Sequence, residues 1–151
     1  MPLDRIDVRQ ARKIMENDRG AVYLDVRTEA EFAEGHPEGA INVPIGTPNP
    51  MMQRMDFNPD FLDVVRASVP ESAAVIVGCR AGPRAEMAAR LLSQSGYHRV
   101  SWVLGGFHGM SDAMGNVMAR GWLELGFPVS REIGEGTGYA SLRMKAGKVR
   151  E

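Results

Sequence analysis

Short apolar runs alternate with helix-like segments along most of this 151-residue chain. The expected strands are residues 21–26, 40–43, 73–78 and 99–104, and the expected helices are residues 8–18, 29–34, 59–67 and 84–95. This alternation predicts an α/β fold, with a central, mostly parallel sheet flanked by helices on both faces. Ligands of such sheets bind at the carboxyl ends of the strands, so residues that directly follow a strand are the first candidates for a site.

Two of the expected helices begin at capping boxes, in which a side chain before the helix and one in its first turn bond each other's backbone. Asp7 and Gln10 have the required spacing at the start of the first helix. Thr28 and Glu31 repeat it at the second. These pairs fix where both helices start.

Other segments carry weaker signals. Asn58 is expected to cap the helix of residues 59–67, with Pro59 at its first position. Residues 45–56 are rich in Pro, Asn and Met and are expected to form a loop. Residues 107–120 are expected to be helical, although their glycines weaken the pattern.

The composition limits the class of protein. With 44% hydrophobic residues the chain suits one globular domain, placed at residues 1–130, followed by a polar, glycine-rich and peripheral tail at residues 131–151. A net charge of −1 gives no basic field for nucleic acid or an anionic membrane. No apolar run is long enough to span a bilayer, and the first ten residues lack a signal-peptide core, so we expect a cytoplasmic protein.

The only cysteine, Cys79, stands in the stretch "VGCRAGPRAEMAARLL" of residues 77–92, between an expected strand and the clearest helix. Three features of this loop stabilise a thiolate. The following helix directs unpaired backbone N–H groups toward the loop, Gly82 lets other amides turn inward, and two arginines add positive charge. The same arrangement holds an incoming anion. The sequence therefore favours a nucleophile over a small buried thiol, which is the common role of a lone cysteine.

The candidate site is this loop. Cys79 is the expected nucleophile. The three histidines of the chain are too far apart in sequence to form a typical metal site with Cys79. The expected binding residues are Arg80, Ala81, Gly82, Pro83, Arg84 and Ala85.

Four motifs along the chain resemble those of the rhodanese family. "CRAGPRA" at residues 79–85 is similar to the family's active-site loop, with alanines where serine is common. "LDVRTEAEFAEGHPEGAINVP" at residues 24–44 resembles its amino-terminal signature, with Pro-Glu in place of Ile-Pro. "VLGGFHGM" at residues 103–110 and "GWLELGFPV" at residues 121–129 resemble two later segments. Motifs in this order cover roughly residues 5–129.

The resemblance implies a rhodanese-like fold and a sulfurtransferase without cofactor or metal. Cys79 would take the outer sulfur of thiosulfate as a persulfide and pass it to cyanide, a thiol or a sulfur-carrier protein. An alternative is a persulfide carrier or protein-binding module with incidental thiosulfate activity. Mercaptopyruvate enzymes of the family usually have a small neutral residue after the cysteine, so Arg80 favours thiosulfate as donor.

Loop length bears on a further alternative. Phosphatases of the same fold use C-x5-R, whereas Cys79 and Arg84 form C-x4-R, with no acidic residue between them. A smaller ring of amides suits sulfur better than tetrahedral phosphate. A phosphatase or arsenate reductase is therefore the less favoured interpretation.

Residues outside the loop carry weaker predictions. For Asp25 we favour a structural ion pair or cap over a role in the site, and Arg27 fits an ion pair and an anion field equally well. For His36 we favour hydrogen bonds within a turn over acid–base chemistry, since transfer from thiosulfate needs no proton shuttle.

The segment after the last expected strand contains three more candidates. Gly105 and Gly106 would let the backbone approach the Cys79 loop, and Phe107 would either wall the site or pack in the core. The many methionines are expected to fill the core, the alternative being a surface for an apolar acceptor or a docked protein. They are Met51, Met52, Met55, Met110, Met114 and Met118.

Overall fold

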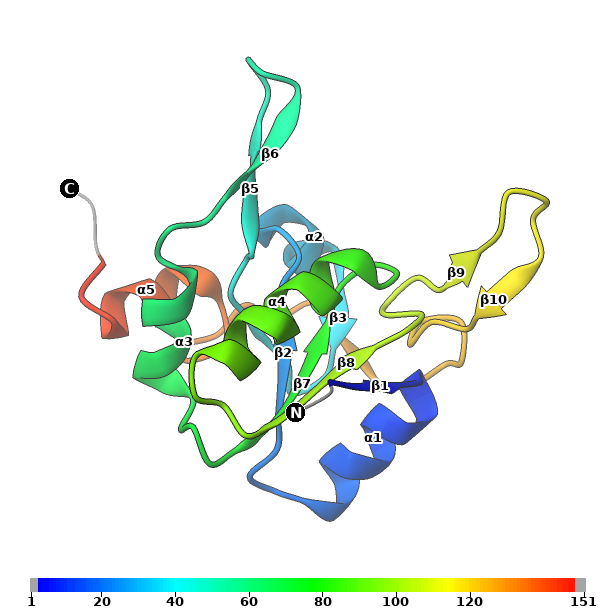
Figure 1. Cartoon of the computed structure of the whole chain (residues 1–151), viewed down its shortest axis with the longest axis horizontal. Coiled ribbons are helices and arrows are strands. Elements are labelled where there is room, and N and C mark those ends of the chain that lie inside the picture. The colour runs from blue at the N-terminus through cyan, green and yellow to red at the C-terminus, as the bar shows by residue number, and fades with distance from the viewer. Residues whose placement is uncertain (1–2, 149–151) are drawn as a thin grey trace.

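The computed structural model describes residues 3–148 and has a five-stranded parallel sheet at its centre (Figure 1). The strand order is β1 (Asp4–Ile6), β8 (Arg99–Val103), β7 (Ala74–Gly78), β2 (Val22–Asp25) and β4 (Ile41–Asn42). All neighbouring pairs are parallel. The predicted α/β architecture is confirmed, and β7, which ends just before Cys79, lies in the middle.

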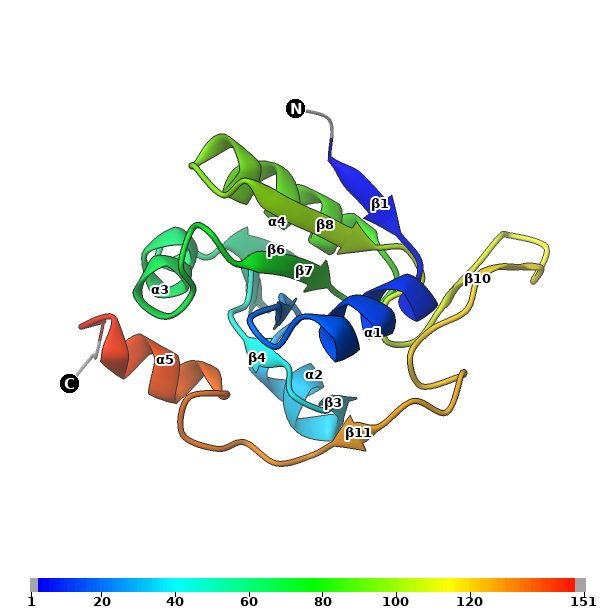
Figure 2. The same ribbon diagram turned by 90° about the horizontal axis from the view of Figure 1, so that it is seen from below.

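Helices cover both faces of the sheet (Figure 2). Their bounds are α1 (Val8–Asn17), α2 (Glu29–Glu34), α3 (Phe61–Ser68), α4 (Pro83–Gln94) and α5 (Tyr139–Lys145). Apolar residues of α3, α4 and α5 form the core on one face, and those of α1 and α2 form the core on the other. Each helix buries one apolar stripe, as the sequence pattern requires.

Both predicted capping boxes are present. The Asp7 carboxylate accepts a hydrogen bond from the Gln10 N–H at 2.8 Å, and the Gln10 side chain accepts one from the Asp7 N–H at 2.9 Å. Thr28 and Glu31 make the equivalent pair at the start of α2. These local bonds explain why the first two helices begin where the sequence places them.

The start of α3 was predicted wrongly. The helix begins at Phe61, with Asp60 as its N-cap, and the Asp60 side chain makes no capping bond. The Asn58 side chain instead donates to the Pro44 carbonyl and the Tyr139 hydroxyl, at 2.9 and 2.8 Å. The same side chain also accepts from the Asp60 N–H at 3.1 Å, so Asn58 keeps a local turn bond beside its tertiary bonds, and the helix starts after that turn. Strand β1 was not predicted, because three residues are too few to show a period.

Residues 107–120 are not helical, which corrects another expectation. They contain a short hairpin of β9 (Met110–Ser111) and β10 (Val117–Ala119). The turn is closed by Asp112, whose carboxylate accepts from the N–H groups of Met114 and Asn116. Gly115 has a φ of 85°, outside the helical region.

Part of the expected loop at residues 45–56 is also a hairpin, formed by β5 (Gly46–Asn49) and β6 (Arg54–Phe57). A third antiparallel pair joins β3 (His36–Pro37) to β11 (Val129–Ser130). The methionines of the two longer hairpins do not fill the core, and those at their tips, Met51 and Met114, are 92% and 85% exposed. Hairpin strands that lie outside the main sheet have no core to fill.

The stretch expected as a peripheral tail contains α5, which packs against α3. Tyr139 and Leu142 are buried in the core on that face, and the Thr137 carbonyl accepts a hydrogen bond from the Asn42 N–H at 2.8 Å. Two apolar residues at helical spacing were enough to anchor an otherwise polar segment. The peripheral position is thus wrong for α5, while the domain boundary at residue 130 stays a prediction.

Within residues 3–148, the structure has no helix that is both long and apolar enough to cross a membrane.

Candidate functional site

Cys79 lies at the carboxyl edge of the sheet, directly after β7 and four residues before α4. Its side chain is only 2% exposed. The run Ala74–Gly78 before it is buried at every position, which is typical of a central parallel strand. The cysteine therefore follows directly on the buried central strand of the sheet.

Backbone N–H groups of the loop are left without partners. Within the described part of the chain, no hydrogen bond uses the N–H of Arg80, Ala81, Gly82, Arg84 or Ala85. The first bond of α4 runs from the Glu86 N–H to the Gly82 carbonyl. Unpaired amides at a helix start favour bound negative charge, so the cradle predicted from the sequence is available to an anion.

The carbonyl groups of the same loop are bonded to the segment after β8. The N–H groups of Phe107, His108 and Gly105 donate to three successive loop carbonyls at 2.9, 2.9 and 2.7 Å. The acceptors are the carbonyls of Cys79, Arg80 and Ala81. These bonds fix the loop backbone, which prevents the carbonyls from competing with an anion for the cradle.

Gly106 makes this contact possible. It has a φ of 52°, and a Cβ added there would collide with the Cys79 carbonyl oxygen and crowd the Arg80 carbonyl group. Gly105 lies equally close to the Arg120 backbone. The predicted close approach of the glycine pair is confirmed, and its reason is backbone contact rather than flexibility.

Arg84 is not a free cation. Its two terminal nitrogens donate to the Glu31 carboxylate at 2.7 and 3.0 Å. Burial raises the pKa of Glu31, but hydrogen bonds from Arg84 and Thr28 outweigh it and lower the pKa to about 2. Glu31 therefore offsets the positive charge that Arg84 was expected to add to the loop and fixes its position, while the role of Arg84 in binding stays a prediction.

Arg80 has the opposite character. Its side chain is exposed, and no carboxylate among residues 3–148 pairs with it. The neighbouring His108 has a lowered pKa, first because of partial burial and then because of the positive charges of Arg80 and Arg27. Arg80 thus remains the loop's unneutralised cation.

Asp25 and Arg27 form a buried ion pair with an Nη2–Oδ2 distance of 2.7 Å. Arg27 also donates to the Gly35 carbonyl at 2.8 Å and stacks over the Phe107 ring, 4.6 Å from its centroid. The structural interpretation favoured for Asp25 is confirmed. Arg27 has a structural role too, because its guanidinium bonds both Asp25, at the end of β2, and the Gly35 carbonyl.

His36 is also buried and bonded within its turn. Its Nδ1 lies 2.7 Å from the Phe32 carbonyl oxygen, and its ring stacks on that of Phe32 with centroids 3.5 Å apart. This geometry matches the hydrogen-bonded role favoured from the sequence. Phe107 has both of the roles expected for it. It packs in the core, and it lines a hollow beside the loop.

That hollow has a volume of about 140 Å³, and its walls include Arg27, Glu31, Phe107 and His108. A larger hollow of about 480 Å³ lies at the opposite, amino edge of the sheet, around Asp4 and Arg99, and contains no predicted site residue. No group of three or more metal-binding side chains occurs in the described region. Size alone would thus point to the edge opposite the Cys79 loop.

Two residues beside the candidate site, Glu31 and Tyr23, were not among the residues predicted for it. Glu31 was read only as a helix cap, and nothing local indicates its bond to Arg84, 53 positions along the chain. Tyr23 fills the space beside Gly78, where a Cβ would collide with the Tyr23 hydroxyl. Its position two residues before Asp25 on the same strand was the available signal, since alternate residues share a face.

Comparisons with known proteins give a family match. The family model described as rhodanese-like domain matches residues 7–113. Thiosulfate sulfurtransferase 16 of Arabidopsis thaliana, a chloroplastic protein, is 43% identical over 88 residues, which cover 58% of this chain and 72% of that protein. Thiosulfate sulfurtransferase 18 of the same plant is 32% identical over 131 residues, which cover 84% of this chain and 83% of that protein.

A solved structure of another protein has a similar fold. The crystal structure of Rv0390 from M. tuberculosis has a TM-score of 0.72 and 30% sequence identity, and the match covers 87% of this chain and 100% of that one. The family match contains the Cys79 loop and the strands on both sides of β7.

Proposed function

Because this chain belongs to the rhodanese-like domain family, we propose that it is a thiosulfate sulfurtransferase that carries sulfur on Cys79 as a persulfide. The donor is thiosulfate, and the acceptor is cyanide or a thiol. Relatives that are named thiosulfate sulfurtransferases support the class of reaction. A cytoplasmic location stays a prediction.

One observation carries the proposal: the only cysteine stands at the start of a loop whose backbone N–H groups have no partners within the described chain. These groups stabilise the thiolate, the anionic donor and the persulfide anion in turn. Since no second cysteine is present, the sulfur has to leave on another molecule.

The reaction has two steps. In the first, the Cys79 thiolate attacks the outer sulfur of thiosulfate, the S–S bond of the donor breaks, and sulfite leaves with the bonding pair. In the second, cyanide or a thiolate attacks the outer sulfur of the persulfide, and Cys79 leaves as a thiolate. Charge is conserved in both steps, and no oxidant or reductant is required.

Side chains around the loop have separate tasks in this proposal. Arg80 attracts and orients the dianionic donor, because its guanidinium is exposed and unpaired within residues 3–148. Arg84 holds the loop in shape through Glu31. Asp25, Arg27 and His36 support the surrounding backbone and take no part in sulfur transfer.

Steady-state kinetics tests the proposal and separates it from its alternative, a persulfide carrier with incidental thiosulfate activity. Thiocyanate formation from thiosulfate and cyanide is measured for the wild type and for Cys79→Ser, which keeps the size of the side chain. Sustained turnover that Cys79→Ser abolishes supports the enzyme. A single stoichiometric release of thiocyanate supports the carrier, and equal rates for both proteins contradict a persulfide at Cys79.

A further inference from the structure

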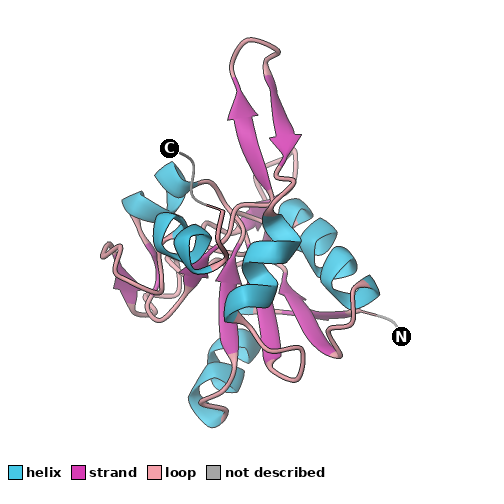
Figure 3. Ribbon diagram, turned by 90° about the vertical axis from the view of Figure 1, so that its left-hand side faces the viewer, coloured by secondary structure: helices cyan, strands magenta, loops and turns pink. Residues whose placement is uncertain are grey.

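Two hairpins rise from the edge of the sheet that holds Cys79. β5–β6 follows the carboxyl end of β4, and β9–β10 follows that of β8. Neither belongs to the five-stranded sheet. In Figure 1 both extend beyond the rest of the molecule, with the amino end of α4 between them, and Figure 3 shows β5–β6 standing clear of the body. The candidate site is thus flanked by two projecting arms.

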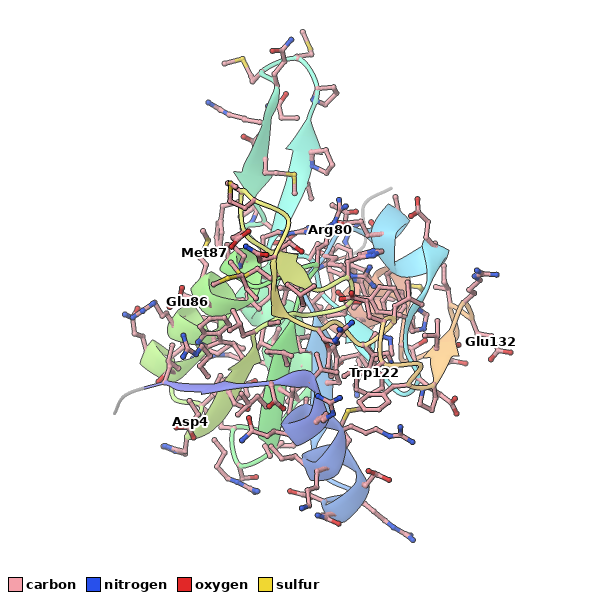
Figure 4. The ribbon with its side chains drawn as sticks, turned by 90° about the vertical axis from the view of Figure 1, so that its right-hand side faces the viewer. Asp4, Arg80, Glu86, Met87, Trp122 and Glu132 are labelled. Carbon is pink, nitrogen blue, oxygen red and sulfur yellow. The ribbon has the colours of Figure 1, made fainter. Side chains whose placement is uncertain are left out.

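These arms concentrate exposed apolar side chains. Of the twelve large apolar side chains that are exposed in the described region, eight lie on the two hairpins or near the start of α4. We call these eight the apolar rim: Met51, Met52, Met55, Phe57, Met87, Met114, Val117 and Met118. Figure 4 shows Arg80 and Met87 below the β5–β6 hairpin. Grouping of this kind around a site marks an interaction surface.

The β5–β6 hairpin has one apolar and one polar face. Pro48 pairs with Met55, and Phe57 pairs with Gly46, so these side chains share a face. On the other face, the Asp56 carboxylate accepts from Asn49 at 2.7 Å and from Arg54 at 2.8 Å. An isolated two-stranded hairpin is only marginally stable in water. Because the apolar face of β5–β6 is exposed, it does not stabilise the hairpin by burial against the rest of the fold.

Charge at the rim indicates what kind of molecule covers it. Neither Arg80 nor Arg120 pairs with a carboxylate within residues 3–148. The hairpin carboxylates, Asp56 and Asp112, are bonded within their own hairpins. Asp56 is neutralised by Arg54, whereas Asp112, in the part of the chain that the structure describes, is bonded only to neutral groups and keeps its charge. Two unpaired arginines thus stand against one unpaired carboxylate, and this surface of apolar contacts and net positive charge complements a partner with apolar and acidic residues.

The burial of Cys79 limits the kind of molecule that can contact the apolar rim and react with the cysteine. With the cysteine 2% exposed beneath the rim, a partner has to deliver its reacting atom on a narrow, extended segment. Thiosulfate and cyanide are too small to reach the hairpin tips while they react at the loop. The molecule that contacts the rim during sulfur exchange is therefore the acceptor and is large.

We infer that the apolar rim docks a protein acceptor, which presents a thiol on an extended segment with apolar and acidic residues around it. The inference rests on the proposed function and names the acceptor class of that reaction. The acceptor thiolate attacks the outer sulfur of protonated Cys79–S–SH, a new S–S bond forms on the acceptor, and the old one breaks. Cys79 leaves as a thiolate, and the acceptor keeps the sulfur and the proton as its own persulfide.

The test follows the discharge of Cys79 persulfide, loaded with thiosulfate, by intact mass. Three probes are compared: a short synthetic peptide with one cysteine flanked by leucine and glutamate, the same peptide with serine for leucine, and glutathione. We expect the leucine peptide to react about tenfold faster than either other thiol, as burial of one or two apolar side chains would give.

The variant M51S/M114S removes one exposed methionine from each hairpin tip, and M144S, at an exposed position of α5, is the matched control. The double variant should lose most of the leucine peptide's advantage, about fivefold or more, with glutathione discharge unchanged. M144S should behave like the wild type. Equal rates for the leucine peptide and glutathione, or an unaffected double variant, would overturn the inference.

Two further outcomes distinguish failure of the docking inference from a dimer and from failure of the proposed function. Light scattering that shows a dimer of the wild type, abolished in M51S/M114S, would assign the rim to a second copy of this chain and overturn the inference. Failure of thiosulfate to load Cys79 would contradict the proposed function itself. Normal loading with no effect of the rim on any thiol would contradict only the docking.

Discussion

Glu31 binds both terminal nitrogens of Arg84, and this ion pair joins the first turn of α2 to the loop that holds Cys79. The carboxylate also accepts from the Thr28 N–H, so one side chain caps a helix and fixes the loop. An arginine of the Cys79 loop thus serves as a structural element, and in the proposed function donor attraction falls to Arg80.

Replacement of Glu31 by glutamine keeps the cap and removes the charge. We expect E31Q to lower the free energy of unfolding at pH 7 by about 1–2 kcal/mol, the range for a half-buried hydrogen bond to a charged group. Urea unfolding measures the loss. E29Q, on the same helix, is the control and should change stability by less than about 0.5 kcal/mol.

The same pair predicts a pH dependence. The pKa of Glu31 is about 2 in the folded protein, below its ordinary value of 4.5, so the unfolded chain takes up the proton first as pH falls. The stabilisation is complete above about pH 4.5 and is lost as the pH falls toward 2. The difference in unfolding free energy between wild type and E31Q should shrink across this window. A difference that stays constant from pH 6 to pH 3 would show that the charge contributes nothing.

Gly106 is the position where a single methyl group should disturb the loop. G106A places a Cβ against the Cys79 carbonyl, and the displaced loop should lower thiocyanate formation by about 10²-fold. G115A is the control, since Gly115 also has a positive φ but nothing lies within 4 Å of its added Cβ. Similar activities for the two variants would mean that backbone strain, rather than contact with the loop, sets the effect.

Arg80 should determine the choice of donor. R80A is expected to raise the KM for thiosulfate about tenfold, the effect of losing one charge-assisted hydrogen bond, and to change that for 3-mercaptopyruvate much less. R80K, which keeps the charge, should recover part of the loss. Steady-state kinetics with both donors gives the comparison, and equal losses for the two would remove Arg80 as a selectivity determinant.

The core position of α5 gives a stability prediction. L142A removes a fully buried side chain and should lower the free energy of unfolding by about 2–5 kcal/mol. M144A, at an exposed position of the same helix, is the control and should have little effect. Chemical denaturation distinguishes them, and a neutral L142A would return residues 131–151 to the status of a peripheral tail.

Local signals in the sequence predicted much of this structure. The capping residues Asp7 and Thr28 fixed two helix starts because their bonds span only three positions. The buried strand before Cys79 and the helix after it indicated the candidate site, because both signals lie close to the cysteine in sequence. The glycine pair was read correctly from its place after a strand.

The failures depend on distant partners. Asn58 bonds the Asp60 N–H locally, but it also bonds Tyr139 across 81 positions, and the helix starts only after this turn. Arg84 was expected to add positive charge to the loop, and the sequence does not show that α2 brings Glu31 beside it to offset that charge. The methionine-rich segments became hairpins outside the sheet, and a composition signal cannot show that no core lies beneath them.

The central claim is that Cys79 accepts a sulfur atom from thiosulfate, and the mass of the intact protein tests it most directly. After incubation with thiosulfate and removal of the excess, the wild type should gain the mass of one sulfur atom, and cyanide should remove it as thiocyanate. Cys79→Ser should show no gain. An unchanged wild-type mass, or the same gain in Cys79→Ser, would contradict the account.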